Sequence, residues 1–170
     1  MIVLGIDPGL ATTGYALVKA DDRRTRHQVL EAGVLRTPAG EDVPQRLRAI
    51  YDDIGQLIDE HQPDAMAIEE VFFNKNVTSA ISVSQARGVV LLAGVDLDVA
   101  EYTPLAVKRQ ICGHGRAQKS QVQAMVQRLL NLRELPKPDD AADALAIALC
   151  HLLAQRSGVT RAQALSRAKR

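Results

Sequence analysis

Two acidic side chains come directly after short apolar segments that are typical of buried β-strands. Asp7 follows the segment 2–6 and is itself followed by a Pro-Gly pair, and Glu69 follows the segment 65–68. An unpaired charge inside a buried strand is costly, so a carboxylate at a strand end points into a turn or a cleft. For Asp7 alone, two interpretations stay open: an Asp that forms the turn, or a ligand in a metal or phosphate site.

A second group of acids begins an apolar segment near the C-terminus. Asp140 and Asp143 are three residues apart in the segment 139–149, so they share one face of a predicted helix, and Asp139 could cap that helix. Acids in a first helical turn complement the helix dipole, which could account for all of them. Asp143, however, lies a turn inside a helix of Ala, Leu and Ile, and this favours a functional role because buried charges are rarely left unpaired.

These acids predict metal-dependent chemistry if the two strand ends and the helix start meet. Asp7, Glu69, Asp140 and Asp143 would then form one cluster, and like charges share a site only with cations or with raised pKa values. Oxygen-rich clusters suit Mg²⁺, with Mn²⁺ as a substitute. Two such ions about 3.5–4 Å apart activate a water and stabilise the leaving oxygen in phosphodiester hydrolysis. The sequence offers no convincing nucleophile–base triad, which agrees with this prediction.

The elements that must position the acids follow a strand-and-helix pattern. Strands are predicted at 2–6, 15–18, 29–35, 65–68 and 97–102, and helices at 43–58, 77–95, 104–111, 122–130 and 139–149. A helix that crosses between the strands 2–6 and 65–68 would place their ends side by side. We therefore expect an α/β fold with a five-stranded mixed sheet flanked by helices.

Length and composition favour one aliphatic-cored domain. The chain has 170 residues, of which 46% are hydrophobic and only 3% aromatic. We expect a single domain at 1–155 and a basic tail at 156–170, which is a candidate for disorder. The two cysteines fit no zinc spacing, no signal peptide is visible and the longest apolar run, 89–95, is too short to span a bilayer. These features predict a cytoplasmic protein without membrane contact.

Positive charge is concentrated in one segment of a nearly neutral chain. Residues 102–137 carry a net charge of +6, whereas residues 1–101 carry −7. Within this segment Lys108, Arg116 and Lys119 bracket a glycine-bearing loop before a helix, an arrangement that suits phosphate contacts. The alternative is a solvated basic face, and for the tail that alternative is favoured.

The only two phenylalanines, Phe72 and Phe73, follow the second strand-end acid. Neighbours in an extended segment point in opposite directions, so both cannot easily enter one core. One of them is therefore expected in the core, and the other is a candidate for a stacking wedge at the mouth of the site, although buried phenylalanines are common.

Several separate motifs resemble the RuvC family of Holliday-junction resolvases, in order from residue 2 to about 152. They are Gly5-Ile6-Asp7-Pro8-Gly9 with Thr13-Gly14, Ala67-Ile68-Glu69-Glu70-Val71-Phe72-Phe73, Ser84-Gln85-Ala86-Arg87-Gly88, Val107-Lys108, Lys119-Ser120-Gln121-Val122 and 140–148. The resemblance implies a ribonuclease H-like fold and a homodimer. It also implies Mg²⁺-dependent nicking of two strands of a four-way DNA junction, together with the RuvA and RuvB branch-migration proteins, in recombination and repair.

The resemblance also implies roles for particular residues. The four acids take the catalytic positions, with Glu69 rather than its neighbour as the second acid. Lys108 and Lys119 match DNA-contacting lysines, and Phe72 matches a base-stacking aromatic. Some members carry His at the position of Asp140, so this chain has the all-carboxylate form.

A symmetric junction calls for two active sites related by a two-fold axis, which agrees with a dimer. The apolar helix at 77–95 is the hypothesised interface, to be tested by a charge at Ala86 or Val90. Two other functions are weighed: an ATP-binding module of the actin and sugar-kinase type, and a junction-binding protein without catalysis. The short chain argues against the first, and the complete set of acids against the second.

Overall fold

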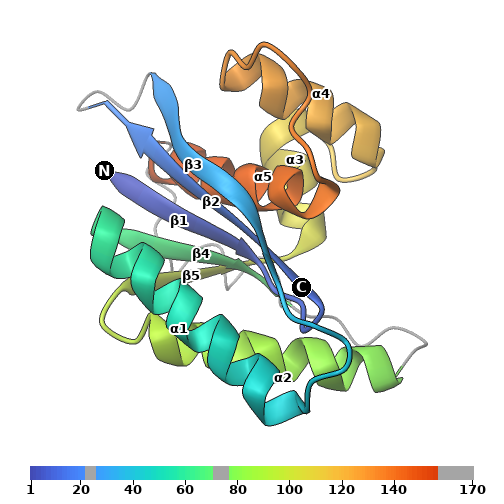
Figure 1. Ribbon diagram of the computed structural model, residues 1–170. Coiled ribbons are helices and arrows are strands. Elements are labelled where there is room, and N and C mark those ends of the chain that lie inside the picture. The colour runs from blue at the N-terminus through green and yellow to red at the C-terminus, as the bar shows by residue number, and fades with distance from the viewer. Residues whose placement is uncertain (22–25, 71–76, 157–170) are drawn as a thin grey trace, which may run out of the picture.

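A five-stranded mixed sheet forms the middle layer of the fold (Figure 1). The computed structural model describes residues 1–21, 26–70 and 77–156. The strands are β1 (Ile2–Asp7), β2 (Thr12–Ala20), β3 (His27–Arg36), β4 (Ala65–Glu69) and β5 (Asp98–Tyr102), in the order β3-β2-β1-β4-β5. β1 and β3 run antiparallel to β2, whereas β4 runs parallel to both β1 and β5. The predicted mixed α/β sheet is confirmed.

Helices cover both faces of this sheet. They are α1 (Val43–His61), α2 (Val77–Ala93), α3 (Pro104–Cys112), α4 (Lys119–Leu129) and α5 (Asp139–Arg156). α1 and α2 lie on one face, while α5 lies on the other together with α3 and α4 (Figure 1). Within the described residues, no helix combines the length and the apolar character needed to cross a membrane.

The central strand β1 is apolar on both faces, which explains its unbroken hydrophobic run. Successive strand side chains point to opposite faces. Val3 accordingly belongs to the core beneath α5, whereas Leu4 and Ile6 belong to the core beneath α1 and α2. Because α1 returns the chain to β4, parallel to β1, Ile6 pairs with Ile68. The next residues, Asp7 and Glu69, therefore end neighbouring strands at the same edge, as predicted.

Several boundaries differ from the expectation, and three of them are informative. β2 begins at Thr12 rather than at Tyr15, because Thr12, Thr13 and Gly14 pair with β3 instead of forming a turn. α2 ends at Ala93, and α5 continues to Arg156, beyond the predicted end at 149. Pairing and packing with distant segments set these ends, which local propensity does not report.

The residues chosen to test the interface helix point inward. Ala86 and Val90 are fully buried in the core between α2 and the sheet. A charge at either position would disrupt the protomer itself, so that choice was wrong. The exposed side of α2 carries Ile81, Gln85, Gly88 and Leu92 instead, at spacings of four, three and four residues.

Candidate active site

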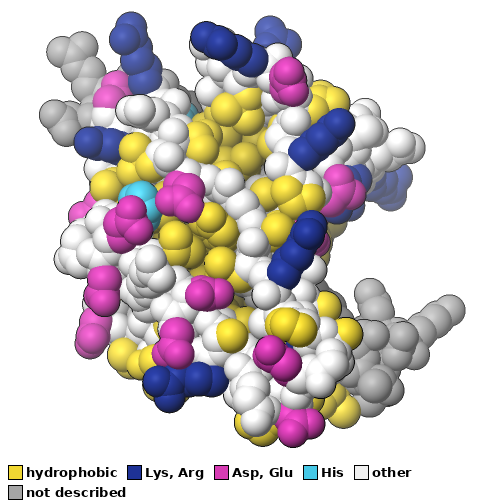
Figure 2. All heavy atoms as spheres, in the orientation of Figure 1, with side chains coloured by type: hydrophobic (Ala, Val, Ile, Leu, Met, Phe, Trp, Pro, Cys, Tyr) yellow, Lys and Arg dark blue, Asp and Glu magenta, His cyan; other side chains and the backbone are white. Residues whose placement is uncertain are grey.

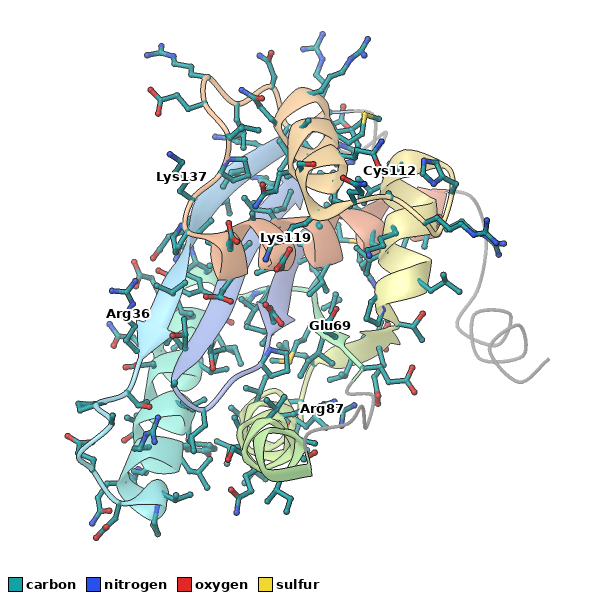
Figure 3. All side chains as sticks on the ribbon, turned by 90° about the vertical axis from the view of Figure 1, so that its right-hand side faces the viewer. Arg36, Glu69, Arg87, Cys112, Lys119 and Lys137 are labelled. Atoms are coloured by element: carbon teal, nitrogen blue, oxygen red, sulfur yellow. The ribbon has the colours of Figure 1, made fainter. Side chains whose placement is uncertain are left out.

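The four predicted acids gather where β1, β4 and α5 meet. Asp7 and Glu69 are the last residues of their strands, and Asp140 and Asp143 lie in the first turns of α5. All four are partly buried. Figure 3 views the molecule from the side on which Glu69 and Lys119 lie. Strand ends and a packed helix are rigid supports, so the backbone of each acid is held in place.

The acids repel one another strongly. Burial, followed by the charges of Glu69, Asp143 and Asp140, raises the pKa of Asp7 from 3.8 to about 8, and Lys119 opposes this only in part. Burial and then the charge of Asp143 also raise the pKa of Glu69, whereas a hydrogen bond with Asp7 and two lysines act in the other direction. Ionisation of these carboxyl groups is therefore unfavourable without a partner. A divalent cation bound among them would stabilise the ionised forms.

Lys119 is the nearest cation to the acids on α5. As the first residue of α4, it places its ammonium group 2.8 Å from Asp143 Oδ2 and 3.3 Å from Asp139 Oδ2. Burial lowers the pKa of Lys119, but the hydrogen bonds and charges of Asp143 and Asp139 outweigh this effect and raise it. The side chain of Gln121 accepts a 2.8 Å hydrogen bond from the backbone N–H of Gln118, which caps the start of α4 and helps to fix the position of Lys119.

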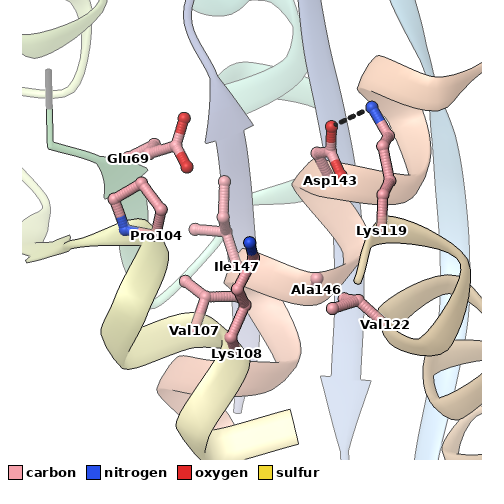
Figure 4. A pocket seen from close by; sticks show the side chains of 9 residues that line it. All are labelled: Glu69, Pro104, Val107, Lys108, Lys119, Val122, Asp143, Ala146 and Ile147. Carbon is pink, nitrogen blue, oxygen red and sulfur yellow. Dashed lines mark hydrogen bonds and ion pairs between the residues drawn. The ribbon is translucent and has the colours of Figure 1, made fainter. Parts of the chain in front are cut away.

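A pocket of about 190 Å³ lies between the acids and the basic segment (Figure 4). Glu69 lines it on one side and Asp143 with Lys119 on the other, and Lys108 of α3 also lines it. The rest of its wall is apolar and consists of Pro104, Val107, Val122, Ala146 and Ile147. The pocket therefore combines carboxylates, two lysines and an apolar wall. This combination suits a phosphate group of a larger substrate.

Two glycines let α5 lie very close to the sheet. A Cβ at Gly14 would overlap the carbonyl oxygen of Asp140 and lie 3.1 Å from its Cβ. A Cβ at Gly5 would lie 2.8 Å from Ala148 Cβ and overlap the carbonyl oxygen of Ala144. Gly14 is also the register partner of Asp7. The absence of a side chain at position 14 thus brings the start of α5 down beside Asp7.

The turn after Asp7 is held by a buried hydroxyl. Thr13 Oγ1 donates a hydrogen bond of 2.7 Å to the carbonyl oxygen of Gly9. Thr13 is fully buried, so this bond is shielded from water. Thr13 and Gly9 thus hold this turn, whereas the side chain of Asp7 lies among the acids of the cluster, which favours the second interpretation of the sequence.

Other predicted residues have different outcomes. Phe72 lies outside the described residues, so its stacking role stays a prediction. Arg116 is exposed in the segment between α3 and α4 and does not line the pocket. Asp139 is the first residue of α5, and its side chain accepts a hydrogen bond from Gln123 and pairs with Lys119, so its expected role as a cap is wrong.

Two pairs near the site were missed from the sequence. Arg87 of α2 pairs with Glu101 of β5, and Tyr102 of β5 contacts His151 of α5. The available signals for Arg87 were its charge on a mostly apolar helix and its place in the motif 84–88 noted in the sequence. A histidine within the apolar C-terminal helix was the corresponding signal for His151.

The residues fit a hard divalent cation by their chemistry. The set contains only carboxylate oxygens, which Mg²⁺ and Mn²⁺ prefer. Among the residues that the structure describes, however, no group of three His, Cys, Asp or Glu side chains has the geometry to hold a metal ion. Rotation of the acidic side chains would have to complete such a site.

Positive and negative side chains are unevenly distributed over the face that Figure 2 shows. In Figure 2, most Lys and Arg side chains lie in the upper and right-hand parts, which contain α3 and α4. Most Asp and Glu side chains lie in the left and lower parts. This agrees with the net charge of +6 on residues 102–137 and suits a polyanion that approaches from the side of α3 and α4.

A protein-family model described as crossover junction endodeoxyribonuclease RuvC matches residues 3–151. A curated relative with this description, from Moorella thermoacetica, is 58% identical over 153 residues, which cover 89% of this chain and 90% of the relative. Another, from Halothermothrix orenii, is 53% identical over 153 residues, with 89% and 92% covered.

Solved structures show the same similarity. The Thermus thermophilus RuvC structure has a TM-score of 0.88 at 35% identity, and the match covers 95% of this chain and 99% of that one. T. thermophilus RuvC in complex with a Holliday junction substrate has the same TM-score and identity, with 95% and 98% covered. The matched segment 3–151 contains all four acids of the site.

Proposed function

Because the chain belongs to the RuvC family of crossover junction endodeoxyribonucleases, we propose that Asp7, Glu69, Asp140 and Asp143 are its metal-binding catalytic residues. The fold is ribonuclease H-like, and the enzyme is a nuclease that acts on four-way DNA junctions. The observation that carries the proposal is the convergence of the four carboxylates, with the pKa of Asp7 raised to about 8. Because the chain belongs to the RuvC family of nucleases, we set aside the two alternative functions, the ATP-binding module and the non-catalytic junction-binding protein.

Mg²⁺ is the proposed metal, with two ions per site and Mn²⁺ as a substitute. Such ions would supply an activated water and neutralise charge on the scissile phosphate. The protein itself holds the four carboxylates in place. Asp7 and Glu69 lie on neighbouring strands, and Asp140 and Asp143 lie on the helix that packs against those strands. Their support on rigid elements limits the reorganisation that the reaction would need.

The basic side chains around the pocket are proposed to hold the DNA backbone. Lys108 and Lys119 line the pocket itself, so they are suited to the phosphates nearest the cut. Arg116 is exposed outside the pocket and is suited to a phosphate further along the strand. The stacking role of Phe72 is part of the same proposal and rests on the sequence alone.

Nicking of a synthetic four-way junction tests this function. With Mg²⁺ we expect paired symmetric nicks in two strands, and with EDTA in place of Mg²⁺ we expect none. A linear duplex of the same sequence is the control and should remain uncut under conditions that resolve the junction. Equal cutting of the duplex, or cutting that persists in EDTA, would contradict the proposal.

We further propose that the enzyme acts as a homodimer through the exposed side of α2. Ile81 and Leu92 are 52% and 61% exposed, and Val95, just beyond the helix, is 68% exposed. Gly88 lies between them, and a Cβ there would meet no atom within 4 Å. A glycine inside a helix costs about 0.5–1 kcal/mol relative to alanine. No contact with the part of the protomer that the structure describes explains Gly88, whereas the close approach of a second helix would.

Leu92→Arg should weaken the dimer by about 2 kcal/mol, or roughly 30-fold in dissociation constant, because it places a charge in a buried apolar contact. Sedimentation over a range of concentrations measures this. Leu105→Arg is the matched control, because Leu105 on α3 is 60% exposed and lies away from the exposed side of α2. If the two variants sediment alike, the interface lies elsewhere.

The remaining assignments complete the proposal. We place the enzyme in the cytoplasm, with RuvA and RuvB as its partners in recombination and repair. We also treat residues 1–155 as one nuclease domain. The last described residue of α5 is Arg156, so the segment 157–170 lies outside the described residues.

A further inference from the structure

A contact between a tyrosine and a histidine joins the two halves of the proposed active site. Tyr102 is the last residue of β5, where it pairs in register with Glu69, and its carbonyl oxygen accepts a hydrogen bond from the backbone N–H of Glu70. Its hydroxyl lies 3.0 Å from Nδ1 of His151 on α5, and the two rings meet edge to face at 5.9 Å. One residue thus touches both the strand that ends on Glu69 and the helix that carries Asp140 and Asp143.

Few large side chains project between α5 and the sheet at the points where α5 crosses Gly5 and Gly14. Where the helix crosses β1 and β2, the backbone of Gly5 lies against Ala144 and Ala148, and Gly14 lies against the backbone of Asp140. Alanine methyl groups over glycine backbone provide few ridges that would resist a small slide of the helix along its axis. A directional contact elsewhere on the helix would therefore add to the packing of the buried α5 side chains in fixing its axial position.

The Tyr102–His151 contact has the properties of such a fixing point. His151 is 1% exposed, so water cannot readily replace a lost partner. Gln155, one turn further along α5, places its side-chain nitrogen 3.5 Å from Nε2 of His151. His151 lies eight residues after Asp143, about 12 Å along the helix at 1.5 Å per residue. Because a helix is rigid over that length, an axial shift at His151 moves Asp143 by a similar amount.

We propose that Tyr102 and His151 form a latch that fixes α5 along its axis and so positions Asp140 and Asp143 relative to Glu69. The latch rests on the proposed roles of these acids. Tyr102 and His151 are positioning residues: they act through the acids and need not touch DNA or metal. The interaction is directional, and a purely apolar contact of the same size would pack without fixing the helix.

Tyr102→Phe removes one hydroxyl and keeps the ring, so it tests the latch with little risk to folding. We expect kcat for junction cleavage to fall about 10-fold and the dissociation constant for Mn²⁺, measured by calorimetry without DNA, to rise about 10-fold. Junction affinity should stay within about twofold, because no proposed DNA contact is altered.

Tyr15→Phe is the matched control. The Tyr15 hydroxyl donates a 2.6 Å hydrogen bond to Glu31 on the same sheet, but this bond joins β2 to β3 and does not involve α5. It should lower thermal stability to a similar extent and leave kcat and Mn²⁺ affinity unchanged. Equal effects of Tyr102→Phe and Tyr15→Phe on kcat and Mn²⁺ affinity would overturn the latch.

Two substitutions at position 151 separate hydrogen bonding from packing. His151→Asn keeps a polar atom near the place of Nδ1 but loses volume, whereas His151→Leu keeps more apolar volume and loses the hydrogen bond. The latch predicts that Asn retains more Mn²⁺ affinity and kcat than Leu, and the reverse order would refute it. If His151→Leu does not fold, the comparison of Tyr102→Phe with Tyr15→Phe decides alone. A wild type that neither cuts junctions nor binds Mn²⁺ would instead refute the proposed site.

Discussion

Asp7→Asn should reduce cleavage of a four-way junction by roughly 10³-fold or more and leave junction affinity within a few-fold. The charges of Glu69, Asp143 and Asp140 all raise the pKa of Asp7, so Asp7 lies among the negative charges that a cation would neutralise. The loss of one carboxylate that would hold the metal would remove several kcal/mol of transition-state stabilisation, and about 4 kcal/mol corresponds to a factor of about 10³. Binding should persist because lysine and arginine contacts to phosphates supply most of the affinity.

Glu70→Gln is the control for Asp7→Asn. Glu70 follows Glu69 directly but is not among the charges that act on Asp7. Single-turnover nicking measures the rate, and a gel-shift titration in Ca²⁺ measures junction affinity. A cleaving Asp7→Asn enzyme, or an equally inactive Glu70→Gln enzyme, would contradict the assigned roles.

The same Asp7→Asn variant should be more stable than wild type at alkaline pH without metal. The pKa of Asp7 is about 8 in the folded protein against an ordinary value of 3.8, so folding takes up a proton between these values. Wild-type stability therefore falls as pH rises from about 4 to about 8, and Asn lacks this dependence. The melting-temperature difference between the two proteins should grow over that range and level off above it. A constant difference would mean that Asp7 is not the titrating group.

Asp7 and Glu69 could be predicted from the sequence because local pattern and topology agree at both. Each follows a short apolar run, and a connection that returns through a helix places the two strand ends together. Asp143 was also recognisable, because a carboxylate inside an apolar helix needs a partner. That partner, Lys119, was visible only as a cation in a basic segment.

Contacts between residues distant in the chain could not be predicted in the same way. Tyr102 and His151 are 49 residues apart, and although a histidine in an apolar helix stands out, no local pattern identifies its partner. Ala86 and Val90 are apolar on a helix that is apolar on several sides, so periodicity did not indicate which side meets the sheet. Asp139 looked like a cap, but a side chain on another helix decides its contacts. Such contacts depend on the packed arrangement of whole elements.

Gly14 is the clearest example of a residue whose role depends on a distant element. The helix that packs against it, α5, begins 125 residues later in the chain. Gly14→Ala should lower junction cleavage about 100-fold, because the added methyl group would overlap the carbonyl oxygen of Asp140. Backbone cannot swing aside as a flexible side chain does, so the start of α5 must rise from β2. A displacement of about 1 Å at a catalytic group can cost about 10² in rate. Overpacking should also cost about 1–3 kcal/mol of stability.

Gly33→Ala separates this displacement from a general loss of stability. Its methyl group would lie 2.9 Å from the Tyr15 hydroxyl, at the end of a side chain that can move, and Gly33 belongs to β3. Both variants should melt below wild type, but only Gly14→Ala should lose cleavage and Mn²⁺ affinity while it still binds the junction. If cleavage instead follows melting temperature across both variants, stability rather than the position of Asp140 is the cause. If Gly14→Ala cuts at the wild-type rate, the site tolerates a raised α5, and the close seat of that helix serves packing alone.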